Sequence, residues 1–137
     1  MRTIIDGLRD APPGHCDYRE YLSALLDDAG DIVDANAVFP HAFQFFEDHA
    51  DADLGMPGPL VHFVERFFPK YVDELCVSVE RKPTTHTVWM VNRILNAKIA
   101  EEMRERLVNL LRAAIDNAAG DETAREQARH FLEHQRA

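Results

Sequence analysis

Apolar residues recur every three or four positions along most of this chain, and no segment alternates apolar and polar residues as a strand does. From residue 18 to the C-terminus this period predicts amphipathic helices joined by short connections. The breaks between them are predicted at Gly30, residues 57–59, Pro69, Pro83 and Gly120. We therefore expect an all-α fold of about six to eight antiparallel helices, in a single domain over residues 1–137. Helix pairs of this length would also suit a HEAT-like helical stack.

Several polar residues mark where helices should begin. Asp17 opens a D-x-x-E capping box, which predicts a helix over the residues that follow it. Proline is favoured in the first turn of a helix, so Pro40 is predicted to start the next one. Thr84 or Thr85 is predicted to cap a helix that runs to about residue 96, and Asp121 to cap the last helix.

The net charge of −9 is confined to the first part of the chain. Residues 1–56 hold twelve Asp and Glu against three Arg, whereas residues 57–137 hold twelve acidic against twelve basic residues. A field of one sign attracts basic partners and repels nucleic acid and anionic membranes. We predict a partner-binding acidic surface, unless basic groups from the second part neutralise it. Its carboxylates are Asp27, Asp28, Asp31, Asp34, Glu47, Asp48, Asp51 and Asp53.

The helix predicted over residues 85–96 carries the most informative polar face. Its apolar arc holds Val88, Met90, Val91, Ile94 and Leu95. The partner-binding candidates on the opposite arc are His86, Trp89, Asn92, Arg93 and Asn96. Trp and Arg are enriched at the energetic centres of protein interfaces, which favours a binding surface. The alternative is a helix buried on both sides, with its Asn side chains capping neighbouring helix ends and Arg93 paired with Glu65 or Glu80.

Catalytic and metal-binding patterns are sparse. His62 and Glu65 share a helix face, and His130 and His134 have the i, i+4 spacing of zinc ligands, but neither pair is a complete site. The chain lacks a glycine-rich phosphate loop and a nucleophile elbow. We therefore expect no enzyme activity, no metal and no cofactor.

The cysteines and the lengths of the apolar segments indicate the cellular compartment in which the protein is expected. Cys16 and Cys76 form no C-x-x-C motif, which is typical of proteins from a reducing compartment. Neither a secretory signal nor an apolar run long enough to span a membrane is present in the sequence. These observations predict a cytoplasmic protein.

Three stretches carry a family resemblance: GPLVHFVE at residues 58–65, RKPT at residues 81–84 and VWMVNRILN at residues 88–96. Together they resemble small all-helical bacterial immunity-type proteins encoded beside polymorphic toxins, over residues 58–97. The resemblance implies a protein that binds and neutralises a cognate toxin, often a nuclease, and it assigns no inhibitory residues. Two alternatives stay open: a helical-repeat scaffold that binds a peptide or protein partner, and a small enzyme or metal protein built around His62 and Glu65.

Overall fold

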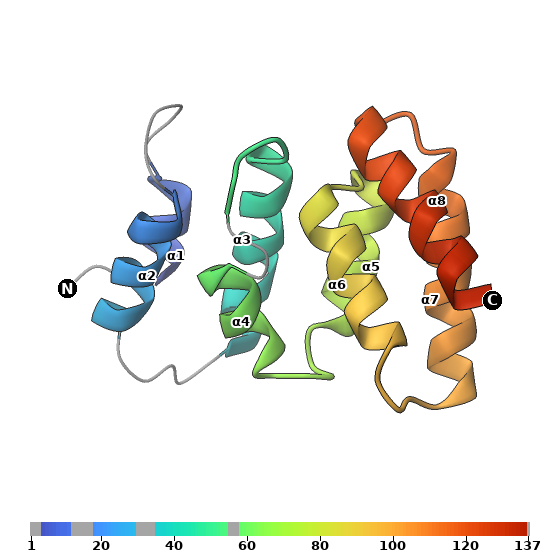
Figure 1. The fold of residues 1–137 in the computed structure, drawn as a ribbon. Helices are drawn as coiled ribbons and strands as arrows, with labels where there is room; N and C mark the ends of the chain where they lie inside the picture. Colours follow the sequence, from blue (N-terminus) through green and yellow to red (C-terminus); the bar gives the residue numbers. More distant parts are fainter. Residues whose placement is uncertain (1–3, 12–17, 30–34, 55–57, 137) are drawn as a thin grey trace. The chain divides into compact units, whose positions relative to one another are not determined.

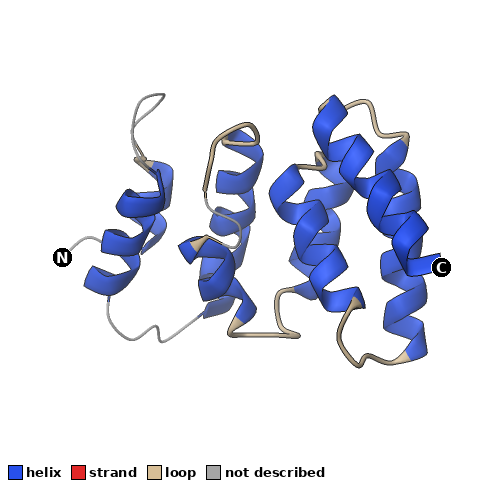
Figure 2. Ribbon diagram, viewed as in Figure 1, coloured by secondary structure: helices blue, strands red, loops and turns tan. Residues whose placement is uncertain are grey.

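The computed structural model describes residues 4–11, 18–29, 35–54 and 58–136, which form eight α-helices and no strand. This confirms the predicted all-α fold (Figures 1 and 2). The helices are α1 (Ile4–Arg9), α2 (Tyr18–Ala29), α3 (Ala35–Asp48), α4 (Pro59–Glu65), α5 (Val72–Arg81), α6 (Thr85–Leu95), α7 (Glu101–Ile115) and α8 (Glu122–Arg136). The predicted break at Gly30 and the predicted cap at Asp17 lie outside the described residues.

The chain divides into two compact units, Met1–Glu74 and Leu75–Ala137. The boundary falls inside α5, and not at the change in charge after residue 56. Each unit is described by itself below. A single domain and a HEAT-like stack both depend on how the units are placed, so these two expectations stay predictions.

In the first unit, α1 packs on α2 and α3, and α4 packs on α2 and α3. Its centre is aromatic. The ring of Phe39 lies 6.2 Å from that of Tyr71 and 5.9 Å from that of Phe67, and the rings of Phe43 and Phe46 are 5.8 Å apart. Phe39, Phe43 and Phe46 are fully buried, so α3 supplies much of this core.

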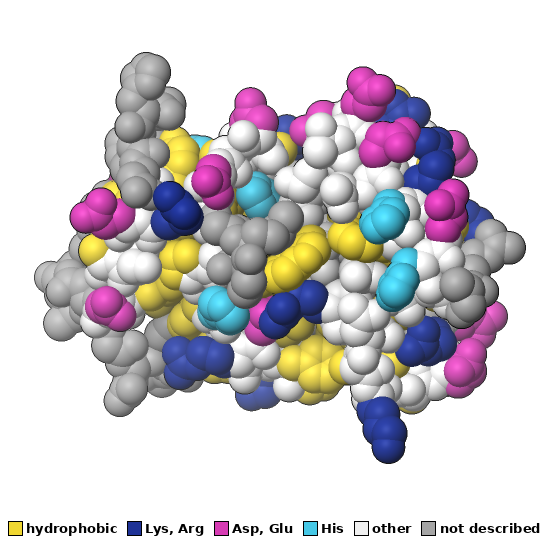
Figure 3. All heavy atoms as spheres, in the orientation of Figure 1, with side chains coloured by type: hydrophobic (Ala, Val, Ile, Leu, Met, Phe, Trp, Pro, Cys, Tyr) yellow, Lys and Arg dark blue, Asp and Glu magenta, His cyan; other side chains and the backbone are white. Residues whose placement is uncertain are grey.

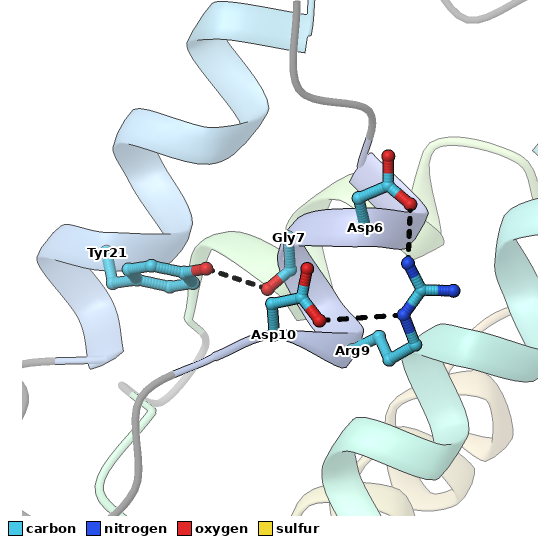
Figure 4. A network of polar contacts seen from close by, with 5 residues as sticks. All are labelled: Asp6, Gly7, Arg9, Asp10 and Tyr21. Atoms are coloured by element: carbon cyan, nitrogen blue, oxygen red, sulfur yellow. Dashed lines mark hydrogen bonds and ion pairs between the residues drawn. The ribbon is translucent and has the colours of Figure 1, made fainter.

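The short helix α1 was not predicted from the sequence. Figure 4 shows how α2 holds it: the Tyr21 hydroxyl donates a hydrogen bond of 2.8 Å to the carbonyl oxygen of Gly7. A Cβ atom at Gly7 would clash with a methyl carbon of the buried Leu25, so glycine allows this close approach. Arg9 pairs with Asp6 at 2.8 Å and with Asp10 at 3.5 Å, both within its own segment.

The predicted start of α3 at Pro40 is wrong. The helix begins at Ala35, and Pro40 lies inside it with its side chain exposed. The longer helix buries Val38 and Phe39 on the same face as Ala42 and Phe43. Burial of these apolar side chains offsets the hydrogen bond that proline, which has no N–H, cannot donate.

In the second unit, α8 packs on both α6 and α7, and α6 packs on α7. Ala124 and Ala128 are fully buried on the inner face of α8, so small side chains let the helices approach closely. Asp121 caps α8 as predicted, because its Oδ1 accepts a hydrogen bond of 2.8 Å from the N–H of Ala124. Gly120, predicted to end α7, lies beyond its last residue, Ile115. It is a close-packing residue, since a Cβ atom there would be 3.2 Å from Pro83.

Thr84, and not Thr85, caps α6. Its Oγ1 accepts a hydrogen bond of 3.1 Å from the N–H of Thr87, and its own N–H donates to Thr87 Oγ1 at 3.2 Å. Both threonines are fully buried. This reciprocal pair fixes where α6 begins, and thereby which of its residues face outward.

Candidate protein-binding surface

Helix α6 keeps its predicted apolar face inside the second unit. Val88, Met90 and Val91 are fully buried, and Ile94 and Leu95 are buried with them. On the opposite arc, Trp89 and Asn92 are half-buried, whereas Arg93 and Asn96 are exposed. The polar arc is therefore only partly covered.

His86 was predicted to belong to the exposed polar arc, and this is wrong. Its side chain is buried, with 5% of its surface exposed. It lies one turn before Met90, which is fully buried, so the core covers this edge of the arc as well.

Trp89 and Arg93 form a stacked pair on the surface of α6. The guanidinium carbon of Arg93 lies 4.7 Å from the centre of the Trp89 ring system. The two residues are four positions apart and therefore neighbours on one helix face. A cation–π contact of this kind contributes about 0.5–1 kcal/mol at an exposed site. The stacking thus orients the indole ring of Trp89 and the guanidinium group of Arg93 before any partner binds.

Asn92 and Asn96 are used within the second unit. Gln135 Nε2 on α8 donates hydrogen bonds to Asn92 Oδ1 at 2.9 Å and to Asn96 Oδ1 at 2.8 Å. Arg104 on α7 donates to the carbonyl oxygen of Leu95 at 2.8 Å and to Gln135 Oε1 at 3.4 Å. These two Asn side chains therefore hold α8 against the end of α6, but they do so by accepting from a side chain, which differs from the capping of helix ends that the alternative predicted.

The sequence analysis did not identify Gln135 or Arg104. Each is a polar residue in phase with the buried positions of its helix. Gln135 lies three residues after the buried Leu132, and Arg104 three residues before the buried Leu107. That phase is the signal in the sequence for a polar side chain directed at a neighbouring helix.

Five of the eight carboxylates predicted to form the acidic surface have described side chains, and four of these are exposed. Asp27, Asp48, Asp51 and Asp53 are exposed in the first unit. Asp31 and Asp34 lie outside the described residues, as does the side chain of Asp28. Glu47 was expected at the surface, which is wrong: it is 4% exposed, because it lies one turn after Phe43 on the inner face of α3. On the face drawn in Figure 3, acidic and basic side chains are interspersed over α7 and α8, in line with the balanced charge of that part.

His49 directly follows the last residue of α3, among the exposed aspartates. Its ring is 4.2 Å from the Phe45 ring and 4.6 Å from the Tyr18 ring on α2. Burial against these rings lowers the pKa of His49 below its usual value, although the carboxylates of Asp48 and Asp51 act in the opposite direction. The imidazole is therefore part of the packing of Tyr18 on α2 against Phe45 on α3.

The other sequence candidates lie on α4 and α8. His62 is exposed and Glu65 half-buried on α4, and both His130 and His134 are exposed on α8. Among the described residues there is no group of three or more His, Cys, Asp or Glu side chains that could hold a metal ion. Cys76 is buried, and Cys16 lies outside the described residues. Within the described part of the chain, no helix is both long and apolar enough to cross a membrane.

The chain matches no family model, no curated protein and no solved structure at a significant level.

Proposed function

We propose that this chain is a non-catalytic binding protein of the bacterial immunity type, which acts in the cytoplasm by binding a cognate toxin. The observation that carries the proposal is the stacked Trp89–Arg93 pair on α6. Trp and Arg are the residues that most often dominate the binding energy of interfaces, and a side chain held in place before binding loses less entropy on association. Capping at Thr84 and the amide contacts of Gln135 fix the helix that carries the pair.

The exposed carboxylates indicate the charge of the partner. The four exposed aspartates belong to a segment with a net charge of −9, in which Arg9 already pairs with Asp6 and Asp10. Such a surface accelerates encounter with a basic protein and is screened beyond about 8–10 Å at physiological salt. A nuclease toxin has a basic substrate-binding surface, which makes it a suitable partner.

The direct test uses the protein encoded by the reading frame immediately upstream. We expect this chain to restore growth to cells that produce that protein and to form a complex with it in calorimetry. The Arg93→Ala variant should bind at least about tenfold more weakly. Arg112→Ala is the matched control, because Arg112 is also an exposed arginine in the last turn of its helix. Failure of the wild-type chain to bind or protect would contradict the proposal.

The role of the acidic surface is tested by association kinetics. Neutralising four aspartates should slow association with the toxin at low salt and leave dissociation nearly unchanged. The substituted residues are Asp27, Asp48, Asp51 and Asp53, each changed to Asn. A control with the same change in net charge replaces four exposed glutamates of the second unit by Gln: Glu101, Glu102, Glu105 and Glu122. Equal slowing in both variants would show that overall charge, and not this surface, directs the encounter.

A further inference from the structure

Two exposed histidines lie one turn apart on the outer side of α8. His130 and His134 are both exposed, and they are separated by four positions within a helix that runs without a break from Glu122 to Arg136. Residues i and i+4 differ by only about 40° around a helix and have Cβ atoms about 5–6 Å apart. The two imidazole rings therefore project next to each other from the same side of α8.

The ring nitrogens of both histidines are available to a ligand. Within the described residues, neither His130 nor His134 takes part in a hydrogen bond or an ion pair. The ring of His130 lies 5.9 Å from that of Phe131, a contact between rings that needs neither nitrogen. The other exposed histidines of the described chain, His41 and His62, belong to different helices, α3 and α4, so they form no such pair.

Contacts on the inner face of α8 hold the backbone that carries the pair. Ala128 and Leu132 are buried before and between the two histidines. After them, Gln135 donates hydrogen bonds to Asn92 and Asn96, which ties the last turn of α8 to the end of α6. Because the two side chains are already held at their helical spacing, a ligand that bridges them does not have to order the backbone first.

Two imidazoles at this spacing can act as a bidentate ligand for a transition metal ion. A histidine nitrogen binds Zn²⁺ at about 2.0–2.1 Å, so two ring nitrogens around one ion lie about 3 Å apart. Side chains that start from Cβ atoms about 5–6 Å apart can converge to that separation. Imidazole suits copper, nickel and zinc, and a given site binds Cu²⁺ more tightly than Zn²⁺, whereas Mg²⁺ prefers oxygen ligands.

The charges beside the pair are compatible with a bound cation. Arg129 precedes His130, but its positive charge is offset by an ion pair with Glu126. Glu133 is exposed and lies three residues after His130, on the same side of the helix. Its carboxylate raises the local concentration of cations.

We propose that His130 and His134 form an exchangeable binding site for one divalent late transition metal ion, with water in the remaining coordination positions. A closed zinc centre has three or four protein ligands, and the described residues offer no group of that size. The site is therefore open to solvent. Two ligands on one scaffold bind more tightly than either alone, by about a hundredfold or more when their geometry fits. The proposal is independent of toxin binding.

Calorimetric titration of the untagged chain with CuCl₂, ZnCl₂ and MgCl₂ tests the proposal. We expect Cu²⁺ to bind at the pair, Zn²⁺ to bind more weakly and Mg²⁺ not to bind. His130→Gln and His134→Gln should each weaken Cu²⁺ binding at least about tenfold, because either change leaves a single ligand. His62→Gln is the matched control: it removes an exposed histidine with no second histidine on its helix, and it should leave the affinity unchanged.

A variant with two adjacent histidines separates the effect of spacing from the number of histidines. Glu133→His combined with His130→Gln keeps two histidines on α8 at neighbouring positions, which do not face each other. It should bind Cu²⁺ no better than His130→Gln alone.

Electron paramagnetic resonance gives a second readout, independent of affinity. The Cu²⁺ complex of the wild-type chain should show two nitrogen ligands, and that of each single variant should show one. No Cu²⁺ binding by the wild-type chain, equal affinity of the wild-type and His134→Gln chains, or full binding by the adjacent pair would each overturn the proposal.

Discussion

Thr84→Ala should destabilise the second unit more than its position at a helix end suggests. Thr84 and Thr87 are fully buried, and they exchange hydrogen bonds of 3.1 and 3.2 Å between their backbone N–H groups and hydroxyl oxygens. The substitution removes the acceptor of the Thr87 N–H. It also removes the hydroxyl that lies 3.0 Å from Thr87 Oγ1. Water cannot replace these groups at a site without exposed surface.

The size of the effect follows from that burial. Loss of a threonine cap costs about 1 kcal/mol on average and up to about 2 kcal/mol in proteins. A buried N–H left without an acceptor costs about 1–3 kcal/mol. Both ranges describe the same lost bond and are not summed. Since the site is fully buried, we expect the upper part of the capping range, a loss of about 2 kcal/mol in the free energy of unfolding.

Urea unfolding followed by circular dichroism measures this loss as a shift of the midpoint at constant slope. Thr85→Ala is the control, because Thr85 is adjacent and half-buried and does not cap α6. Thr84→Ser keeps the hydroxyl and should lose less than half as much as Thr84→Ala. A loss below about 0.5 kcal/mol for Thr84→Ala, or an equal loss for Thr85→Ala, would refute the reasoning.

Two further predictions concern the contacts between helices. Gln135→Ala removes both hydrogen bonds to α6 and should cost about 1–2 kcal/mol of unfolding free energy in urea. Glu133→Ala, at an exposed position of the same helix, should change it by less than about 0.5 kcal/mol. Because the pKa of His49 is lowered in the folded state, the unfolded chain takes up the proton first as the pH falls through 6.5, the ordinary pKa of a histidine. Stability should therefore decline from that pH downward, and His49→Gln should lessen the decline; an identical pH profile for this variant would contradict the assignment.

The sequence predicted the helices whose apolar period is long and clearly bounded. The caps at Thr84 and Asp121 act through neighbours three residues away, so a local pattern suffices to find them. The helix α1 has six residues, fewer than two turns, and offers too short a period to recognise. Pro40 misled the prediction of α3, because the buried ring of Phe39 outweighs the local preference of proline for a first turn.

For the candidate binding surface, the sequence predicted which residues of α6 share a face, but not which of them other helices cover. A helical-wheel projection of residues 85–96 places Trp89 and Arg93 on a polar arc, and in the structure the two side chains are stacked there. It could not show that the core covers His86, nor that Gln135, 39 and 43 positions away, engages Asn96 and Asn92. The burial of His86 and the contacts of Gln135 depend on which helices pack around α6. That packing is decided by residues far apart in the sequence, which a local pattern does not show.

The central claim is that the Trp89–Arg93 pair binds the partner. The measurement that tests it most directly compares Trp89→Ala with the wild-type chain in two assays, toxin binding by calorimetry and urea unfolding. Since Trp89 is half-buried and lies outside the core, we expect binding to weaken by about 2 kcal/mol, on the order of thirtyfold, with a loss of less than about 1 kcal/mol in unfolding free energy. Unchanged binding, or a loss of stability of about 3–5 kcal/mol as for a core aromatic residue, would contradict the claim.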